Sequence, residues 1–208
     1  QEAVELKLAG EVTIRVRLVD CVGFMVEGAA GHLEDGAERL VKTPWYDHEI
    51  PFTQAAELGT RKVITDHSTI GVVVTTDGSF SDLPQETYLD AENQAISELK
   101  KLHKPFLVLV NSSHPSSRTA REAAERIEKQ HSVTAMPVNC AQLSEEDIRQ
   151  IMEQILYEFP VSRVEFYMPK WVEMLPFSHP LKTGLIEKIR ELTGKIRTIR
   201  DVAEHPIV

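Results

Sequence analysis

Three short apolar runs, separated by helical patterns, constrain the fold of this chain more than any other feature. The runs cover residues 70–76, 105–111 and 133–139, and the helical patterns cover 86–103, 116–130 and 144–159. Continuous apolar strands are typical of a parallel sheet whose two faces are both covered. The alternation of buried strand and helix therefore predicts an α/β fold, with a mostly parallel sheet and helices on both faces.

An antiparallel hairpin is predicted ahead of this sheet. Residues 3–9 and 12–19 alternate apolar and polar around a Gly-containing turn, which is the pattern of a half-buried strand pair. We expect one side of the second strand to face the core, namely Val12, Ile14, Val16 and Leu18.

A long connection and a helix follow the hairpin. Residues 21–52 have no clear periodicity and contain several Gly and acidic residues, which predicts a surface loop. Thr53 is followed by Gln-Ala-Ala-Glu, which predicts a capped helix running to about residue 67.

The pattern changes after Pro160. A short strand is predicted over 162–168 and a long helix over 179–201. We therefore predict two domains, 1–160 with the parallel sheet and 161–208 as the start of a second, α+β domain.

Charge and composition narrow the functional classes. The chain has 208 residues, and 23 Lys and Arg against 32 Asp and Glu give a formal net charge of −9, which does not favour binding of nucleic acid. Two cysteines are too few for a disulfide framework, so we expect a cytoplasmic setting. We predict neither a signal peptide nor a membrane span. Because the chain does not begin with Met, we interpret it as a segment of a longer protein.

The end of the second hairpin strand carries a candidate nucleotide motif. Asp20 and Gly23 form Asp-x-x-Gly, the pattern with which switch-type nucleotide hydrolases hold Mg²⁺ and meet a γ-phosphate. A strand-end Asp is also an ordinary turn former, so both interpretations stand. The first makes Asp20 and Gly23 catalytic, with Mg²⁺ held by Asp20 through water.

Further candidates end the later strands. Asn111 takes the place of the Asn in the Asn-Lys-x-Asp motif that reads guanine, while Ser112 stands at the Lys position and His114 at the Asp position. The carboxylate that accepts two guanine N–H groups is therefore missing. Asn111, Ser112 and Asn139 are the predicted nucleotide-binding residues, although an Asn that only closes a strand is an equal alternative.

A phosphate loop is the missing component. No Gly-x-x-x-x-Gly-Lys-Ser/Thr pattern occurs, so nothing here supplies the amides and Lys that hold β- and γ-phosphates. We expect that loop and the central strand before it to precede residue 1.

Other patterns have ordinary interpretations. The histidines are too widely spaced for a local metal motif, and Ser112–His114 lack a nucleophile elbow. Trp45 and Trp171 fit packing anchors or partner contacts, and the basic face of 182–200 fits a solvated surface or a docking surface.

Several longer runs resemble the stage IV sporulation protein A family of endospore-forming bacteria. These are 17–23 (RLVDCVG), 43–46 (TPWY), 55–64 (AAELGTRKVI), 67–78 (HSTIGVVVTTDG), 104–106 (KPF), 110–111 (VN), 156–160 (LYEFP) and 168–171 (MPKW). The resemblance covers essentially the whole chain but less than half of a family member.

This resemblance implies a morphogenetic ATPase of the translation-factor-related GTPase class, with a P-loop NTPase-like fold. Such a protein hydrolyses ATP with Mg²⁺ and polymerises into the basement layer of the spore coat. It acts in the mother-cell cytoplasm at the forespore membrane, with a small amphipathic anchor peptide and other coat proteins as partners. By the resemblance, Asp20 is the Mg²⁺-linked Asp and Gly23 the mobile switch glycine. The alternative function is a nucleotide-independent scaffold with a vestigial site.

Overall fold

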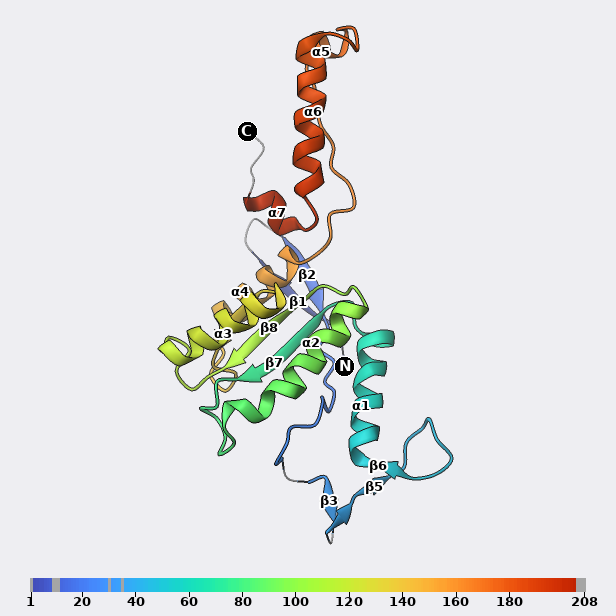
Figure 1. Cartoon of the computed structure of the whole chain (residues 1–208), viewed down its shortest axis with the longest axis vertical. Helices are drawn as coiled ribbons and strands as arrows, with labels where there is room; N and C mark the ends of the chain where they lie inside the picture. Colours follow the sequence, from blue (N-terminus) through green and yellow to red (C-terminus); the bar gives the residue numbers. More distant parts are fainter. Residues whose placement is uncertain (1, 9–11, 30, 35, 205–208) are drawn as a thin grey trace. The chain divides into compact units, whose positions relative to one another are not determined.

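The computed structural model describes residues 2–8, 12–29, 31–34 and 36–204 (Figure 1). The chain divides into two compact units, Gln1–Ile155 and Leu156–Val208. The predicted domain limits, 1–160 and 161–208, stay a prediction.

A three-stranded parallel sheet forms the centre of the first unit. Its strands lie in the order β7 (Gly71–Thr76), β8 (Phe106–Asn111) and β9 (Ala135–Val138). The connections contain the 3-10 turn η3 (Gln85–Tyr88) and the helices α2 (Leu89–Lys101) and α3 (Arg118–His131), and α4 (Glu145–Tyr157) follows β9. The predicted α/β fold with a parallel, P-loop NTPase-like sheet is confirmed.

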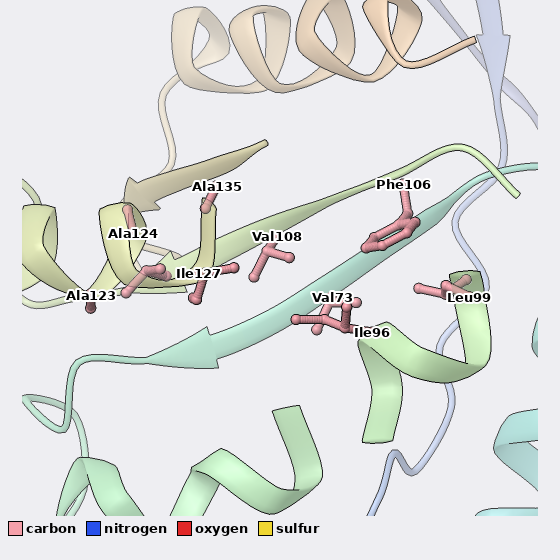
Figure 2. Packing of buried hydrophobic residues seen from close by; sticks show 10 residues of the cluster. Val73, Ile96, Leu99, Phe106, Val108, Ala123, Ala124, Ile127 and Ala135 are labelled. Carbon is pink, nitrogen blue, oxygen red and sulfur yellow. The ribbon is translucent and has the colours of Figure 1, made fainter. Parts of the chain in front are cut away.

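Helices cover both faces of this sheet. On one face, Ile96 and Leu99 of α2 and Ile127 of α3 pack against the β7 and β8 side chains Val73 and Val108 (Figure 2). The alternate β8 residues, Leu107 and Leu109, are also buried. They point to the opposite face, where α4 lies (Figure 2), because successive strand residues alternate sides.

One strand of the sheet is less covered than the apolar pattern predicts. Val72 and Val74 of β7 are 38% and 58% exposed. Full coverage was expected for all three strands, and for β7 this expectation is wrong. In the described part of the chain β7 pairs only with β8, so one edge of the sheet is open beside these side chains.

The predicted hairpin is present. Strand β1 (Val4–Lys7) pairs antiparallel with β2 (Thr13–Val16), and Leu6 lies opposite Ile14. The predicted turn falls at 9–11, outside the described residues. Val12 and Leu18 are 47% and 71% exposed, so the core-facing side is wrong for these two residues. Among the described residues the two strands pair only with each other.

The long connection contains two short strand pairs and leads into α1 (Phe52–Lys62). The pairs are β3 (Leu33–Glu34) with β4 (Ala37–Glu38), and β5 (Leu40–Val41) with β6 (Ile50–Pro51). The predicted cap at Thr53 is wrong. This residue lies inside α1, and its hydroxyl donates to Glu38 at 2.6 Å.

The end of α1 is tied to the sheet. The helix continues into a π-helical turn, η2 (Val63–His67). The ammonium of Lys104, two residues before β8, donates to backbone carbonyls of this region, at 3.0 Å for Thr65. A single lysine therefore satisfies carbonyls that the helix end leaves without a backbone partner.

The second unit is helical in its described part. It contains α5 (Lys170–Glu173), α6 (Pro180–Lys195) and α7 (Ile199–Glu204). Residues 162–168 form no strand, and the bridge in this region joins Pro160 to Thr198. The predicted strand is therefore wrong.

The predicted helix over 179–201 is two helices rather than one. Ile196 has an extended backbone. The Asp201 carboxylate accepts hydrogen bonds from the N–H groups of Arg197 and Thr198 at 2.7 and 2.8 Å. These bonds cap a new helix start and interrupt the longer pattern. None of the described helices has the length and apolarity needed to cross a bilayer.

Candidate functional site

The carboxyl ends of β7, β8 and β9 meet at one edge of the sheet, the edge where open α/β folds bind ligands. Asn111 at the end of β8 links all three. Its carbonyl oxygen accepts from the N–H of Asp77 at 3.4 Å, and its side-chain oxygen accepts from the N–H of Cys140 at 2.9 Å. The side chain of Asn111 thus fixes the loop that follows β9.

Asn139 shapes the same loop. Its side-chain oxygen accepts from the N–H of Ala141 at 3.0 Å, and its backbone carbonyl accepts from the N–H of Gln142 at 3.0 Å. Asn111 and Asn139 therefore lie at the predicted edge. Their contact with a nucleotide stays a prediction.

Ser112 begins the loop that follows β8, residues 112–114, which is the candidate base-binding loop. Its side chain is fully buried. The hydroxyl accepts from the backbone N–H of His114 at 3.1 Å and donates to the carboxylate of Asp77. In this structure Ser112 therefore positions the loop, while the ring of His114 is exposed and lies 3.1 Å from the hydroxyl of Ser113. Nucleotide binding by Ser112 stays a prediction.

Asp77 organises this edge, although it was not among the predicted site residues. Partial burial raises the pKa of its carboxyl group. Hydrogen bonds from Ser112 and Ser79 together lower that pKa by more than burial raises it, so the pKa lies below its ordinary value. The carboxylate accepts from the N–H and the hydroxyl of Ser79 at 3.0 and 2.5 Å, and the Ser79 hydroxyl accepts from the N–H of Ser113 at 2.9 Å. Its position at a strand end was the available sequence signal.

Asp20 and Gly23 lie after β2, and the backbone of Gly23 contacts Thr60 of α1. The backbone of Gly23 has a φ of +87°, which favours glycine. Its N–H donates to the Thr60 hydroxyl at 2.9 Å, and that hydroxyl donates to the Gly23 carbonyl at 3.1 Å. Sequence reasoning missed Thr60 because the residue looks like any helix position. Its partner is 37 residues away.

The donor chemistry of this segment fits a partly hydrated Mg²⁺ ion. Asp20 is exposed, and Mg²⁺ is commonly held by one or two carboxylates together with waters and phosphate oxygens. Within the described residues, no three His, Cys, Asp or Glu side chains gather into a metal site. Asp20 therefore fits as one ligand, direct or through water, beside a bound nucleotide.

A cavity of about 290 Å³ adjoins this segment. Trp45 forms part of its wall, lies against Gly59 of α1, and has the Lys62 ammonium 5.7 Å from its ring centroid. The cavity is lined by Cys21, Val22, Trp45, Gly59, Lys62, Val63, Asp66 and His67. Trp45 therefore packs against α1 with part of its ring while 42% of the residue stays exposed, and its predicted role as packing anchor or partner contact stays a prediction.

A family profile described as "Stage IV sporulation protein A, ATPase domain" matches residues 1–160. The chain belongs to the stage IV sporulation protein A family. A second profile of this family, described as the middle domain, matches residues 161–206. The first match contains the sheet and the candidate site, so the site lies in an ATPase-type domain of a sporulation protein family.

Individual family members agree with this assignment. Stage IV sporulation protein A of Clostridioides difficile (strain 630) is 43% identical over 201 residues, and those of Bacillus anthracis and Bacillus subtilis (strain 168) are 37% identical. Each alignment covers 97% of this chain and 41% of the relative. The chain thus spans about two fifths of the length of these curated relatives. No solved structure matches it.

Proposed function

We propose that this chain forms most of the ATP-hydrolysing domain of a morphogenetic sporulation protein. The observation that carries the proposal is the position of Asp20 and Gly23, which form an Asp-x-x-Gly segment in the connection that follows β2, inside the ATPase-domain match. In switch-type hydrolases this segment lies beside the γ-phosphate and its metal ion.

The residues of this segment have distinct roles in the proposal. The exposed Asp20 carboxylate holds Mg²⁺, directly or through water, and that ion neutralises phosphate charge when it is bound. The N–H of Gly23 donates to a γ-phosphate oxygen. At the sheet edge, the loop held by Asn111, Ser112 and Asn139 contacts the base.

The phosphate-binding loop belongs to a part of the protein outside these 208 residues. Two observations support this step. Among the described residues β7 pairs only with β8, and Val74 is 58% exposed. The chain also covers only 41% of the length of its relatives. We propose that one further strand, followed by the phosphate loop, lies between β2 and β7. The chain alone is then expected to bind Mg-nucleotide weakly and not to hydrolyse it.

Adenine is the proposed base. Guanine recognition requires a carboxylate that accepts two N–H groups together, and His114 stands at that position with Ser112 buried below it. Without that carboxylate, the site makes no extra hydrogen bonds to guanine and therefore does not favour GTP. We therefore expect ATP to be used at least as well as GTP.

The biological role in the proposal follows from family membership. ATP hydrolysis drives polymerisation into the basement layer of the spore coat, in the mother-cell cytoplasm at the surface of the forespore. The proposed partners are further copies of the protein, a small amphipathic peptide that anchors it to the forespore membrane, and other coat proteins.

The experiment compares this chain with a version extended at its amino terminus to include the family's phosphate loop. ATP and GTP turnover are measured for both at one Mg²⁺ concentration. The proposal predicts turnover only for the extended protein, with kcat/KM for ATP equal to or above that for GTP. A GTP preference of about tenfold or more would contradict the base assignment.

A nucleotide-independent scaffold is the second candidate. It is favoured by internal hydrogen bonding, because Asp77 and Ser112 at the sheet edge, and the N–H of Gly23 beside α1, all have protein partners. This candidate predicts no turnover of either nucleotide by the extended protein and assembly that proceeds equally well without them.

A further inference from the structure

A hydrogen-bonded pair joins the Asp-x-x-Gly segment to α1. Thr60 is 3% exposed, and its hydroxyl contacts both backbone polar groups of Gly23, accepting from the N–H at 2.9 Å and donating to the carbonyl at 3.1 Å. A hydroxyl has one hydrogen to donate. The hydroxyl hydrogen of Thr60 and the N–H hydrogen of Gly23 are therefore both engaged in this pair.

This pairing excludes a second use of the glycine N–H. A backbone N–H carries one hydrogen, so the Gly23 group cannot make a full hydrogen bond to Thr60 and to a phosphate oxygen at once. The exclusion matters because the proposed function requires that N–H at the γ-phosphate. A bound triphosphate has to displace Thr60.

Release does not leave the Thr60 hydroxyl without a partner. Within helices, Thr commonly donates to the carbonyl four residues earlier, which here belongs to Ala56. A carbonyl oxygen has two lone pairs, so it accepts this bond beside its helical one. The hydroxyl thus has two alternative acceptors, and moving between them avoids the cost of a buried unpaired donor.

We infer that Thr60 is a positioning residue that holds Gly23 away from the nucleotide and releases it when a γ-phosphate is bound. The inference rests on the proposed function for its release step. The hold itself rests only on the contacts of this chain. Loss of the hydroxyl should free Gly23 in the absence of ligand and raise the affinity for triphosphate relative to diphosphate.

The hold is tested on the 208-residue chain without ligand. Amide hydrogen exchange of Gly23 is measured by NMR in the wild type, Thr60→Val and Thr60→Ser. Thr60→Val removes the hydroxyl at similar size and should speed exchange by about tenfold, the effect of losing one or two hydrogen bonds. Thr60→Ser keeps the hydroxyl and should stay near the wild type.

The amides of Val108 and Ser112 serve as internal controls, because they bond to the Thr134 and Val138 carbonyls in the sheet. Their exchange should not change in either variant. Unchanged Gly23 exchange in Thr60→Val, or equal acceleration in both variants, would overturn the hold.

The release is tested in the amino-terminally extended protein. Dissociation constants for a non-hydrolysable ATP analogue and for ADP are measured with Mg²⁺. Thr60→Val should tighten the triphosphate by about two- to tenfold relative to the diphosphate, because only the triphosphate competes with Thr60. Equal effects on both nucleotides would overturn the release. If the wild type binds neither nucleotide, the proposed function and the release fail together, while the exchange result still decides the hold.

Discussion

The parallel sheet and the β1–β2 hairpin both contain alternating or continuous apolar residues, but the side chains of the central strand β8 are more deeply buried than those of the hairpin. Val108 and Val110 of β8 are fully buried, whereas Val4 of β1 is 66% exposed and Leu18 after β2 is 71% exposed. Strand β8 has a strand on each side and helices on both faces, whereas the hairpin pairs only with itself among the described residues. An alternating or continuous apolar pattern thus predicts that a strand forms. How deeply its side chains are buried depends on the neighbouring strands and helices, which the pattern does not show.

The largest expected effect comes from truncating one apolar side chain in each region. Ile127 on α3 is fully buried in the sheet core, so Ile127→Ala should lower the free energy of unfolding by about 4 kcal/mol. Leu18→Ala removes a side chain of the same size that is mostly in water, and should change it by less than about 0.5 kcal/mol. Urea denaturation of both variants makes the measurement. Similar losses would show that the two regions do not differ in burial.

An ion pair between a buried carboxylate and a half-buried guanidinium sharpens the same contrast. Arg126 contacts both carboxylate oxygens of Glu92, at 2.9 and 3.1 Å, and Thr75 of β7 donates to that carboxylate at 2.8 Å. Arg126→Ala leaves the nearly inaccessible Glu92 charge unpaired and should cost about 3 kcal/mol in unfolding free energy.

The matched control for this pair is Arg118→Ala. Arg118 pairs with Glu122 on the exposed side of α3, so its loss should change the free energy of unfolding far less than Arg126→Ala does, because solvent screens an exposed ion pair. Equal destabilisation by the two arginine variants, measured by urea denaturation, would contradict the packing described for Glu92.

The start of β7 tests how tightly the covered face is packed. A Cβ atom on Gly71 would lie 2.7 Å from a methyl carbon of Leu99 and 3.2 Å from the Cβ of Phe106. Gly71→Ala should therefore destabilise the chain by about 2 kcal/mol through overpacking. Gly184→Ala is the control, since nothing lies within 4 Å of its added Cβ. A neutral Gly71→Ala in thermal unfolding would show that the Leu99 side chain adapts freely.

The smallest effect concerns pH at the sheet edge. The pKa of Asp77 is lowered in the folded chain because hydrogen bonds from Ser112 and Ser79 outweigh burial. The ionised form therefore contributes stability above its unfolded pKa of about 3.9, and this contribution is lost as pH falls through the lower folded pKa.

The wild type should thus be more stable than Asp77→Asn at pH 7, and the difference should shrink below about pH 4. Ser79→Ala, which removes one donor, should reduce this pH dependence only in part. Urea titrations at several pH values make the comparison. A stability difference that stays constant down to pH 2 would contradict the role given to the carboxylate.

Local signals predicted the elements, and contacts between distant residues decided the rest. The run 105–111 predicted β8, and Ser144 with Asp147 predicted the start of α4, where each residue's side chain bonds the other's backbone N–H at 2.8 and 3.1 Å. The Thr60–Gly23 pair was unpredictable, since it depends on how α1 packs. The exposure of Val74 could not be predicted either, because the apolar pattern of a strand does not show which face of the sheet lacks a covering element.

The same distinction applies to the candidate site. The polar positions Asp20, Asn111 and Asn139 were predictable from apolar runs followed by polar residues, and the structure places the latter two at one edge of the sheet. The prediction of a strand reaching to Asp20 is wrong, because β2 ends at Val16. The buried position of Ser112 was not predictable, because it follows from the register of β8 against β9. The sequence thus predicted the edge of the sheet where the candidate site lies, while the contacts in the structure show how Ser112 and Asn111 hold its loops.

The account's central claim is that Asp20 acts in nucleotide hydrolysis. It is tested most directly by ATP turnover of the amino-terminally extended protein and its Asp20→Ala variant, with Glu27→Ala as a control in the same segment. Asp20→Ala should lower kcat by about 10²-fold or more, with an unchanged urea midpoint because the side chain is exposed. Glu27→Ala should keep wild-type turnover. Unchanged hydrolysis by a folded Asp20→Ala variant would contradict the claim and leave the Asp-x-x-Gly segment as a turn.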